Sequence, residues 1–195
     1  MIPLLRAMLL LLCCGCASAP PISSWEPAEA GDYEDVLAAW TRHGERYENF
    51  EGRLFATATL FSPAFTARYG EFEGRRRGLE GDELQRFIDT KVERTAQETR
   101  LFLSLHTVDL LWNQLEREGG VFEATLFVDD APLQPVKVER IMLQESSFIP
   151  LLFPYFTPLC RGYWVTFPAV SPNRTLRFRI SGAPASLTLN WRIPS

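Results

Sequence analysis

The feature that most constrains this chain is an alternation of apolar and polar residues that recurs through residues 100–195. In the last such segment the apolar positions are Leu187, Leu189, Trp191 and Ile193, and the polar positions are Ser186, Thr188, Asn190 and Arg192. Successive side chains of a strand point to opposite faces of a sheet, so a segment of this kind has one apolar and one polar face. Strands with two such faces are typical of antiparallel sheets that pack on a core. Residues 100–195 therefore predict a β-rich antiparallel sandwich.

The same alternation predicts where the other strands lie. It recurs at residues 100–106, 122–128, 136–143, 163–167 and 175–180. Asp129-Asp130-Ala-Pro separates two of these segments and is typical of a turn. Residues 53–61 add an earlier strand, since this segment alternates and carries Thr and Phe. We therefore expect about seven strands.

Three segments have apolar residues at helical spacing and predict helices at residues 33–47, 63–77 and 82–99. Asp32 is a suitable N-cap for the first helix, and Ser62-Pro63 is a typical start for the second. The predicted fold class is α+β. It is an antiparallel β-sandwich of about seven strands with an N-terminal helix and a helical insertion between the first and second strands.

The first residues have the layout of a secretory signal peptide, in which Arg6 precedes a short apolar run and a group of small residues. The run is too short to cross a bilayer, which needs about 20 apolar residues. Gly15-Cys16 resembles the lipobox of bacterial membrane lipoproteins, although Cys13 occupies a position that is usually Leu. A second interpretation stays open, because Ala17-Ser-Ala19 matches an ordinary cleavage site. That cut would leave a proline first, which resembles a known obstruction to that peptidase.

The lipoprotein resemblance implies a domain organisation and a location. Residues 1–15 would be the cleaved signal peptide, residues 16–31 a tether lipidated at Cys16, and residues 32–195 one globular domain. The membrane would then be a partner through the lipid on Cys16. Ala17 rather than Asp follows this cysteine, which implies the outer membrane, on the periplasmic side. The whole chain also resembles lipoproteins of GC-rich predatory and soil bacteria.

Composition excludes several classes of function. With 46% hydrophobic residues the chain is globular, and without residues 1–15 its net charge is −5, which disfavours nucleic acid as a partner. The chain has only two histidines, so we expect no metal and no other cofactor. Cys160 would be the one unmodified thiol of the processed chain, and we expect it to pack as a small buried hydrophobe.

Catalysis is a less favoured hypothesis. Ser104, His106 and Asp109 could form a serine–histidine–acid set, but two residues of one strand rarely meet as nucleophile and base. No G-x-S-x-G nucleophile motif is present. We therefore predict a protein that is not an enzyme.

One segment and one charge cluster are candidate contact sites. Residues 148–159 contain three prolines and no charge, so they form neither a regular helix nor a central strand. They either fold over the end of the core or form a contact surface for lipid or a partner. The arginine run at residues 75–77 is either a solvated turn or a contact for an acidic partner. The candidate contact residues are Phe148, Phe153, Tyr155, Phe156, Arg75, Arg76 and Arg77.

The function predicted from these features is a non-enzymatic binding or scaffolding module of the cell envelope, with an envelope protein as the candidate partner. Two alternatives remain. One is a carrier of an apolar ligand held between the helices and the sheet, which predicts an enclosed apolar pocket. The other is an envelope hydrolase. The sequence specifies neither the partner nor the oligomeric state.

Overall fold

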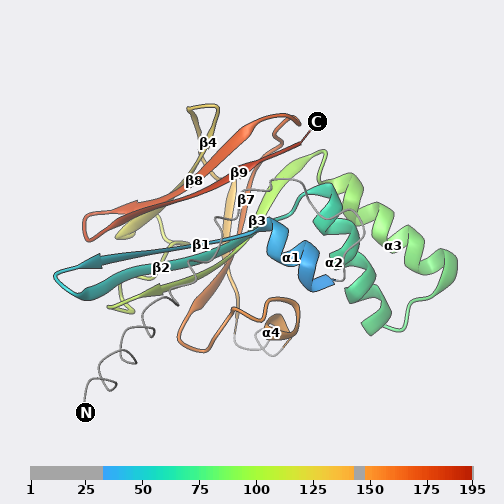
Figure 1. Cartoon of the computed structure of the whole chain (residues 1–195), viewed down its shortest axis with the longest axis horizontal. Helices are drawn as coiled ribbons and strands as arrows, with labels where there is room; N and C mark the ends of the chain where they lie inside the picture. Colours follow the sequence, from blue (N-terminus) through green and yellow to red (C-terminus); the bar gives the residue numbers. More distant parts are fainter. Residues whose placement is uncertain (1–32, 143–147, 195) are drawn as a thin grey trace, which may run out of the picture.

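The computed structural model describes residues 33–142 and 148–194, which form two antiparallel sheets and four helices (Figure 1). The five-stranded sheet has the order β1 (Thr41–Glu48), β2 (Glu51–Leu60), β3 (Glu98–Thr107), β7 (Arg161–Pro168), β6 (Lys137–Arg140). The four-stranded sheet has the order β5 (Ala131–Leu133), β4 (Phe122–Val128), β8 (Thr175–Gly182), β9 (Ser186–Arg192). The predicted α+β class with antiparallel sheets is confirmed.

The core lies between the two sheets and is built from the predicted apolar rows. On β7, Phe167 meets Phe178 of β8, with ring centroids 6.1 Å apart in an edge-to-face arrangement. The rows that share this space are fully or almost fully buried: Leu101, Leu103 and Leu105 on β3, Tyr163 and Val165 on β7, and Leu176 and Ile180 on β8. Alternation therefore predicted the inner face of these strands, but β3 is buried on both faces, since Phe102 and Ser104 on its outer face are buried as well.

The two sheets also meet along one side, where β1 lies beside β9. Trp191 of β9 donates a hydrogen bond from its indole Nε1 to the carbonyl oxygen of Trp40, 2.8 Å away. Arg42 of β1 donates from Nε to the carbonyl oxygen of Asn190 over 3.1 Å. The last strand, β9, thus contacts Trp40, which precedes β1, and Arg42, which lies near the start of β1.

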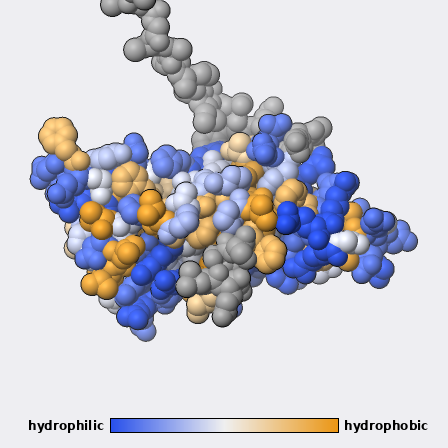
Figure 2. Space-filling view, turned by 90° about the horizontal axis from the view of Figure 1, so that it is seen from below, coloured by the Kyte–Doolittle hydropathy of each residue, from blue (hydrophilic) through white to orange (hydrophobic). Residues whose placement is uncertain are grey.

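The outer face of the five-stranded sheet is covered as well. The covering elements are α1 (Tyr33–Trp40), α2 (Pro63–Arg76) and the segment around α4 (Ile149–Leu152), while α3 (Gly81–Arg94) packs on α2 and lies farthest out (Figure 1). No residue of α3 is fully buried. On the face seen from below, the end of the molecule formed by α2 and α3 is mainly hydrophilic (Figure 2).

The helical insertion leaves its two flanking strands paired. Ser62 caps α2, since its Oγ accepts a hydrogen bond from the amide of Phe65 over 3.1 Å, and Pro63 follows it. The chain returns after α3 and the amide of Phe61 donates to the carbonyl oxygen of Arg100 over 2.9 Å. The insertion thus joins β2 and β3, which are the first and second strands of the prediction.

Two predicted helices end earlier than expected. The helix predicted at residues 33–47 ends at Trp40, and residues 41–48 form β1. This strand lies at the edge of its sheet and is mostly exposed, so it has no apolar face to alternate with a polar one. The helix predicted at residues 82–99 ends at Arg94, because residues from Glu98 onward pair with β7.

These corrections account for the number of strands. The described part of the chain has nine, and the two that were not expected are β1 and the three-residue β5. The strand predicted at residues 136–143 covers only Lys137–Arg140, and residue 143 lies outside the described residues. The left-handed backbone of Asp129 and Asp130 makes the predicted turn.

The predicted signal peptide, the predicted tether and Cys16 lie outside the described residues. Within the described ranges, no helix is both long and apolar enough to span a membrane.

Candidate functional site: a cationic cleft beside the helical insertion

Three of the candidate contact residues line one cleft. Arg76, Arg77 and Phe148 belong to a cleft of about 670 Å³ between α2, the segment at α4, and strands β3 and β7. We call it the cationic cleft. Its lining residues are Tyr69, Glu73, Arg76, Arg77, Arg100, Phe148, Ile149, Leu152 and Trp164. Two segments that are separate in the sequence thus form a single concave surface.

Helical geometry places one wall of the cleft. Tyr69, Glu73 and Arg76 follow one another at intervals of four and three residues, so they lie on one face of α2. The opposite wall is apolar, and it is formed by residues 148–152. Arg100 and Trp164 come from neighbouring strands of the five-stranded sheet, β3 and β7. The cleft therefore has a charged wall, an apolar wall and a mixed surface where it meets the sheet.

Arg100 is the most unusual charge in the cleft. Its guanidinium carbon lies 4.1 Å from the ring centroid of Trp164, which is cation–π geometry. Burial lowers the pKa of Arg100, and the nearby Tyr69 and Glu98 oppose this effect. Within the described ranges Arg100 forms no ion pair with a carboxylate. A half-buried cation without a direct counter-charge favours the binding of an anion.

The carboxylate of Glu73 pairs with two cations, of which Arg77 lines the cleft. Glu73 forms ion pairs with Arg77 and, over 2.8 Å, with Lys91 of α3. Burial, followed by the negative charge of Glu73, raises the pKa of Tyr69, which keeps its hydroxyl protonated. Arg76 lies 5.8 Å from the ring of Phe72, and no described carboxylate pairs with it. The cleft therefore carries an excess of positive charge.

The apolar segment at residues 148–159 contains both buried and exposed side chains. Phe153 is 0% exposed and Phe156 is buried beside Phe102, whereas Phe148 is 62% exposed. The segment thus folds mainly over the outer face of the five-stranded sheet, as the core interpretation predicts. Phe148 remains accessible at the cleft. The space between α2 and the sheet is filled by aromatic rings, including those of Phe61 and Phe65.

Tyr155 is held by a directed chain of hydrogen bonds. Thr41 Oγ1 donates to the carbonyl oxygen of Leu37 over 2.7 Å, so its only proton is used. Thr59 must then donate to Thr41 over 2.6 Å, and the Tyr155 hydroxyl must donate to Thr59 over 2.6 Å. Tyr155, a candidate contact residue, thus has a structural role. Its hydrogen bonds connect residues 148–159 to β2 and, through Thr41, to α1.

Arg75 does not line the cleft, unlike its neighbours Arg76 and Arg77. It forms an exposed ion pair with Glu71 over 2.7 Å, one turn earlier on α2, and does not line the cleft. Surface pairs of this kind contribute little to stability.

The residues of the hydrolase hypothesis do not form a hydrogen-bonded set within the described part of the chain. Ser104 is 3% exposed. His106 Nδ1 lies 2.9 Å from the carbonyl oxygen of Leu159, so this nitrogen carries the proton. The Asp109 carboxylate accepts the amide of Leu111 over 2.8 Å. Within the described residues no hydrogen bond joins any two of the three.

The described residues contain no group of three or more His, Cys, Asp or Glu side chains that could hold a metal ion. Cys160 is half-buried against the core, with Sγ 3.5 Å from Thr157 Oγ1. It is thus less buried than we expected.

No family model matches the chain, and no curated protein matches it.

Proposed function

We propose that this protein is an envelope-anchored, non-enzymatic binding module whose cationic cleft takes a small acidic ligand with an apolar portion. The observation that carries the proposal is Arg100, a half-buried cation that stacks on Trp164 and has no carboxylate partner among the described residues. A ligand acid group would supply the missing counter-charge.

The two walls of the cleft support this ligand chemistry. Arg76 and Arg77 provide positive charge on one side, while Phe148, Ile149 and Leu152 provide apolar surface on the other. Ligand sites for small molecules usually occupy about 300–1,000 Å³, combining apolar lining with a few polar groups. The cleft, at about 670 Å³, lies within that range. An acidic amphiphile therefore fits both its size and its chemistry.

The envelope location rests on the lipobox resemblance at Cys16. A tether of about sixteen residues reaches at most about 55 Å when fully extended. A domain held this close to a bilayer would meet acidic amphiphiles that leave or enter the membrane. Binding without catalysis is the version that we propose, since Ser104 is buried, and His106 and Asp109 form hydrogen bonds with other groups.

The test is an isothermal calorimetric titration of the full chain with dodecanoate, kept below its critical micelle concentration. The uncharged dodecanol is the matched ligand. Arg100→Gln should weaken dodecanoate binding about tenfold or more, because a hydrogen bond to a charged group is worth about 1.5–3 kcal/mol. Arg179→Gln is the matched control, since Arg179 is exposed on β8 in the other sheet.

The two possible failures are distinct. Equal affinity for dodecanol and dodecanoate would show that the acid group is not recognised. An unchanged affinity of the Arg100→Gln variant would show that the ligand binds elsewhere. Either result would overturn the proposal.

A further inference from the structure

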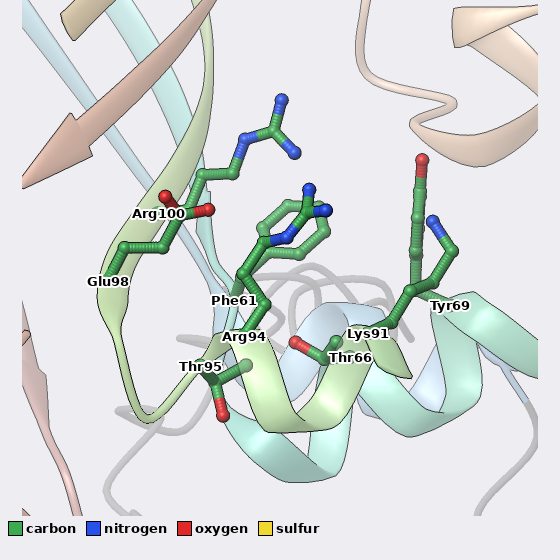
Figure 3. Close-up of a pocket in the computed structure, with 8 residues that line it drawn as sticks. All are labelled: Phe61, Thr66, Tyr69, Lys91, Arg94, Thr95, Glu98 and Arg100. Carbon is green, nitrogen blue, oxygen red and sulfur yellow. The ribbon is translucent and has the colours of Figure 1, made fainter. Parts of the chain in front are cut away.

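A second, smaller cavity adjoins the cationic cleft and shares Tyr69 and Arg100 with it. Its volume is about 40 Å³, and it lies between α2, the end of α3 and the start of β3 (Figure 3). Its lining residues are Phe61, Thr66, Tyr69, Lys91, Arg94, Thr95, Glu98 and Arg100. One water needs about 10–15 Å³ of such space, so the cavity holds roughly three waters or the oxygens of one small anion.

Thr66 gives this cavity an unpaired hydrogen-bond donor. The residue is 4% exposed, and its Oγ1 has no partner among the described residues. Figure 3 shows this oxygen turned toward the side of the cavity where Arg94 and Thr95 lie. A buried hydroxyl without a partner costs about 1–3 kcal/mol, so a group that fills the cavity and accepts this proton would be stabilised.

Comparison with other threonines shows that Thr66 is unusual. Thr90 in α3 donates to the carbonyl oxygen of Arg86 over 2.8 Å, and Thr41 after α1 donates to that of Leu37 over 2.7 Å. These are the bonds to the carbonyl four residues back that helical threonines commonly make. Thr66 lies inside α2 but does not make this bond. Its hydroxyl therefore keeps its proton for another acceptor.

The cavity also carries positive charge from two elements. Arg94 comes from the last turn of α3 and Arg100 from β3, and the charge of Arg94 contributes to the lowered pKa of Arg100. Neither forms an ion pair with a described carboxylate. Lys91 is paired with Glu73, which leaves Glu98 as the acidic residue of the lining. Two unpaired arginines beside one glutamate leave the lining with a net positive charge.

We propose that this cavity is a subsite for a tetrahedral oxyanion, a phosphate or a sulfate, and that it binds the acidic group of the ligand. This inference rests on the proposed function for the remainder of the ligand. Thr66 donates its hydroxyl proton to one oxygen, and Arg94 and Arg100 pair with the others. The three donors come from three different elements, α2, α3 and β3. A tetrahedral group offers acceptors in several directions, whereas a planar carboxylate offers only two oxygens.

Thr95 provides a matched control within the same cavity. Its hydroxyl already donates to the carbonyl oxygen of Val92 over 2.7 Å, so it has no proton left for a ligand. Thr66→Val and Thr95→Val both replace a hydroxyl by a methyl group of similar volume. Because the Thr66 hydroxyl is buried and unpaired, Thr66→Val should not lower the stability of the fold, and a urea titration will verify this.

The experiment is calorimetry of the full chain with dodecyl phosphate, dodecanoate and inorganic phosphate. We expect dodecyl phosphate to bind at least about fivefold more tightly than dodecanoate, and inorganic phosphate to compete with it. Thr66→Val should remove this preference with dodecanoate affinity unchanged, as expected for the loss of one hydrogen bond of about 1 kcal/mol or more. Thr95→Val should leave the preference intact.

The outcomes distinguish a failure of the subsite from a failure of the proposed function. Dodecyl phosphate binding that is the same in the parent and in Thr66→Val would overturn the subsite and leave the proposed function standing. If no amphiphile binds while inorganic phosphate binds in a Thr66-dependent manner, the subsite holds for the free ion and the proposed function fails. If inorganic phosphate binds but does not compete with dodecyl phosphate, the headgroup is held elsewhere and the subsite assignment is wrong.

Discussion

The ring of Phe153 is stacked on the ring of Phe102, with centroids 4.0 Å apart and planes inclined by 23°. Phe102 lies on the outer face of β3, and Phe153 comes from a segment that follows it by about fifty residues. Both side chains are completely buried. This contact makes the outer face of the five-stranded sheet a second apolar layer beside the core between the sheets.

Phe153→Ala should therefore destabilise the fold by about 3–5 kcal/mol, the usual cost of truncating a buried phenylalanine. Phe148→Ala, in the same segment but 62% exposed, should cost less than about 1 kcal/mol. Urea unfolding of both variants measures the difference. Equal and small effects would contradict the core position of Phe153.

The direction of the Tyr155 hydrogen-bond chain gives a second prediction. Tyr155 is the last donor, so Tyr155→Phe removes one bond and leaves Thr59 able to donate to Thr41. Thr59→Val removes the middle member and leaves the Tyr155 hydroxyl without its acceptor. We expect about 1 kcal/mol for the first change and about 1–3 kcal/mol for the second. Chemical denaturation at neutral pH measures both, and the reverse order would contradict the assigned direction.

Acid sensitivity should arise partly at Asp129. The amide of Thr175, 3.0 Å from one carboxylate oxygen, and Arg174, 2.7 Å from the other, hold the pKa of Asp129 below its ordinary value. A lowered folded-state pKa stabilises the fold above the unfolded-state pKa of about 4, and this contribution is lost as the pH falls through the folded-state value.

Asp129→Asn tests this prediction, because asparagine tolerates the left-handed backbone at this turn but carries no charge. The urea midpoint of the variant should fall less steeply than that of the parent between pH 5 and about pH 2. Identical slopes would show that Asp129 does not contribute to the acid sensitivity.

A close approach of the backbone at Gly182 gives a further prediction. A Cβ at this position would lie 2.2 Å from the carbonyl oxygen of Val121, a backbone atom that cannot move without disturbing β4. Gly182→Ala should therefore cost well over 1 kcal/mol. At Gly44 the nearest atoms are the ends of the Leu187 side chain, 3.0 Å away, and they can shift. Gly44→Ala should thus be the milder change, as thermal unfolding would show.

Lipidation at Cys16 can be tested in cells. Cys16→Ser should abolish incorporation of a labelled fatty acid and leave the precursor uncleaved or the protein soluble. Cleavage after Ala19 does not need Cys16. The Ala17-Ser-Ala19 site therefore predicts that the parent incorporates no fatty acid and that the variant is processed like the parent. A processed, membrane-bound Cys16→Ser variant would contradict the lipoprotein assignment.

The sequence predicted strands that have a buried apolar face better than strands that have none. The alternation at residues 175–180 and 186–193 reflects burial on one face only. Both segments are strands, the second of them at a sheet edge, and their predicted apolar residues are buried except the half-buried Ile193. Thr41–Glu48 has no such signal, because its position depends on pairing with β2 and on contact with β9 rather than on its own apolar face. Trp40 and Tyr47 happen to keep helical spacing across the boundary.

The candidate site was predictable only in part. Arg76, Arg77 and Phe148 were singled out by local features, a charge run and an apolar run. Arg100 was not, because in a strand it resembles any polar residue of an alternating pattern. Its importance depends on Trp164 beside it and on the absence of a paired carboxylate among the described residues, and both are properties of the folded arrangement.

The bond from Trp191 to Trp40 spans 151 positions of the chain, and this span bears on how the protein is made. Contacts so distant in sequence form late, because a long loop must close before they contribute. The exposed edge of residues 41–48 thus has no partner on that side until residues 186–192 have left the ribosome. The contact between the first and last strands is therefore completed only after nearly the whole chain has been synthesised.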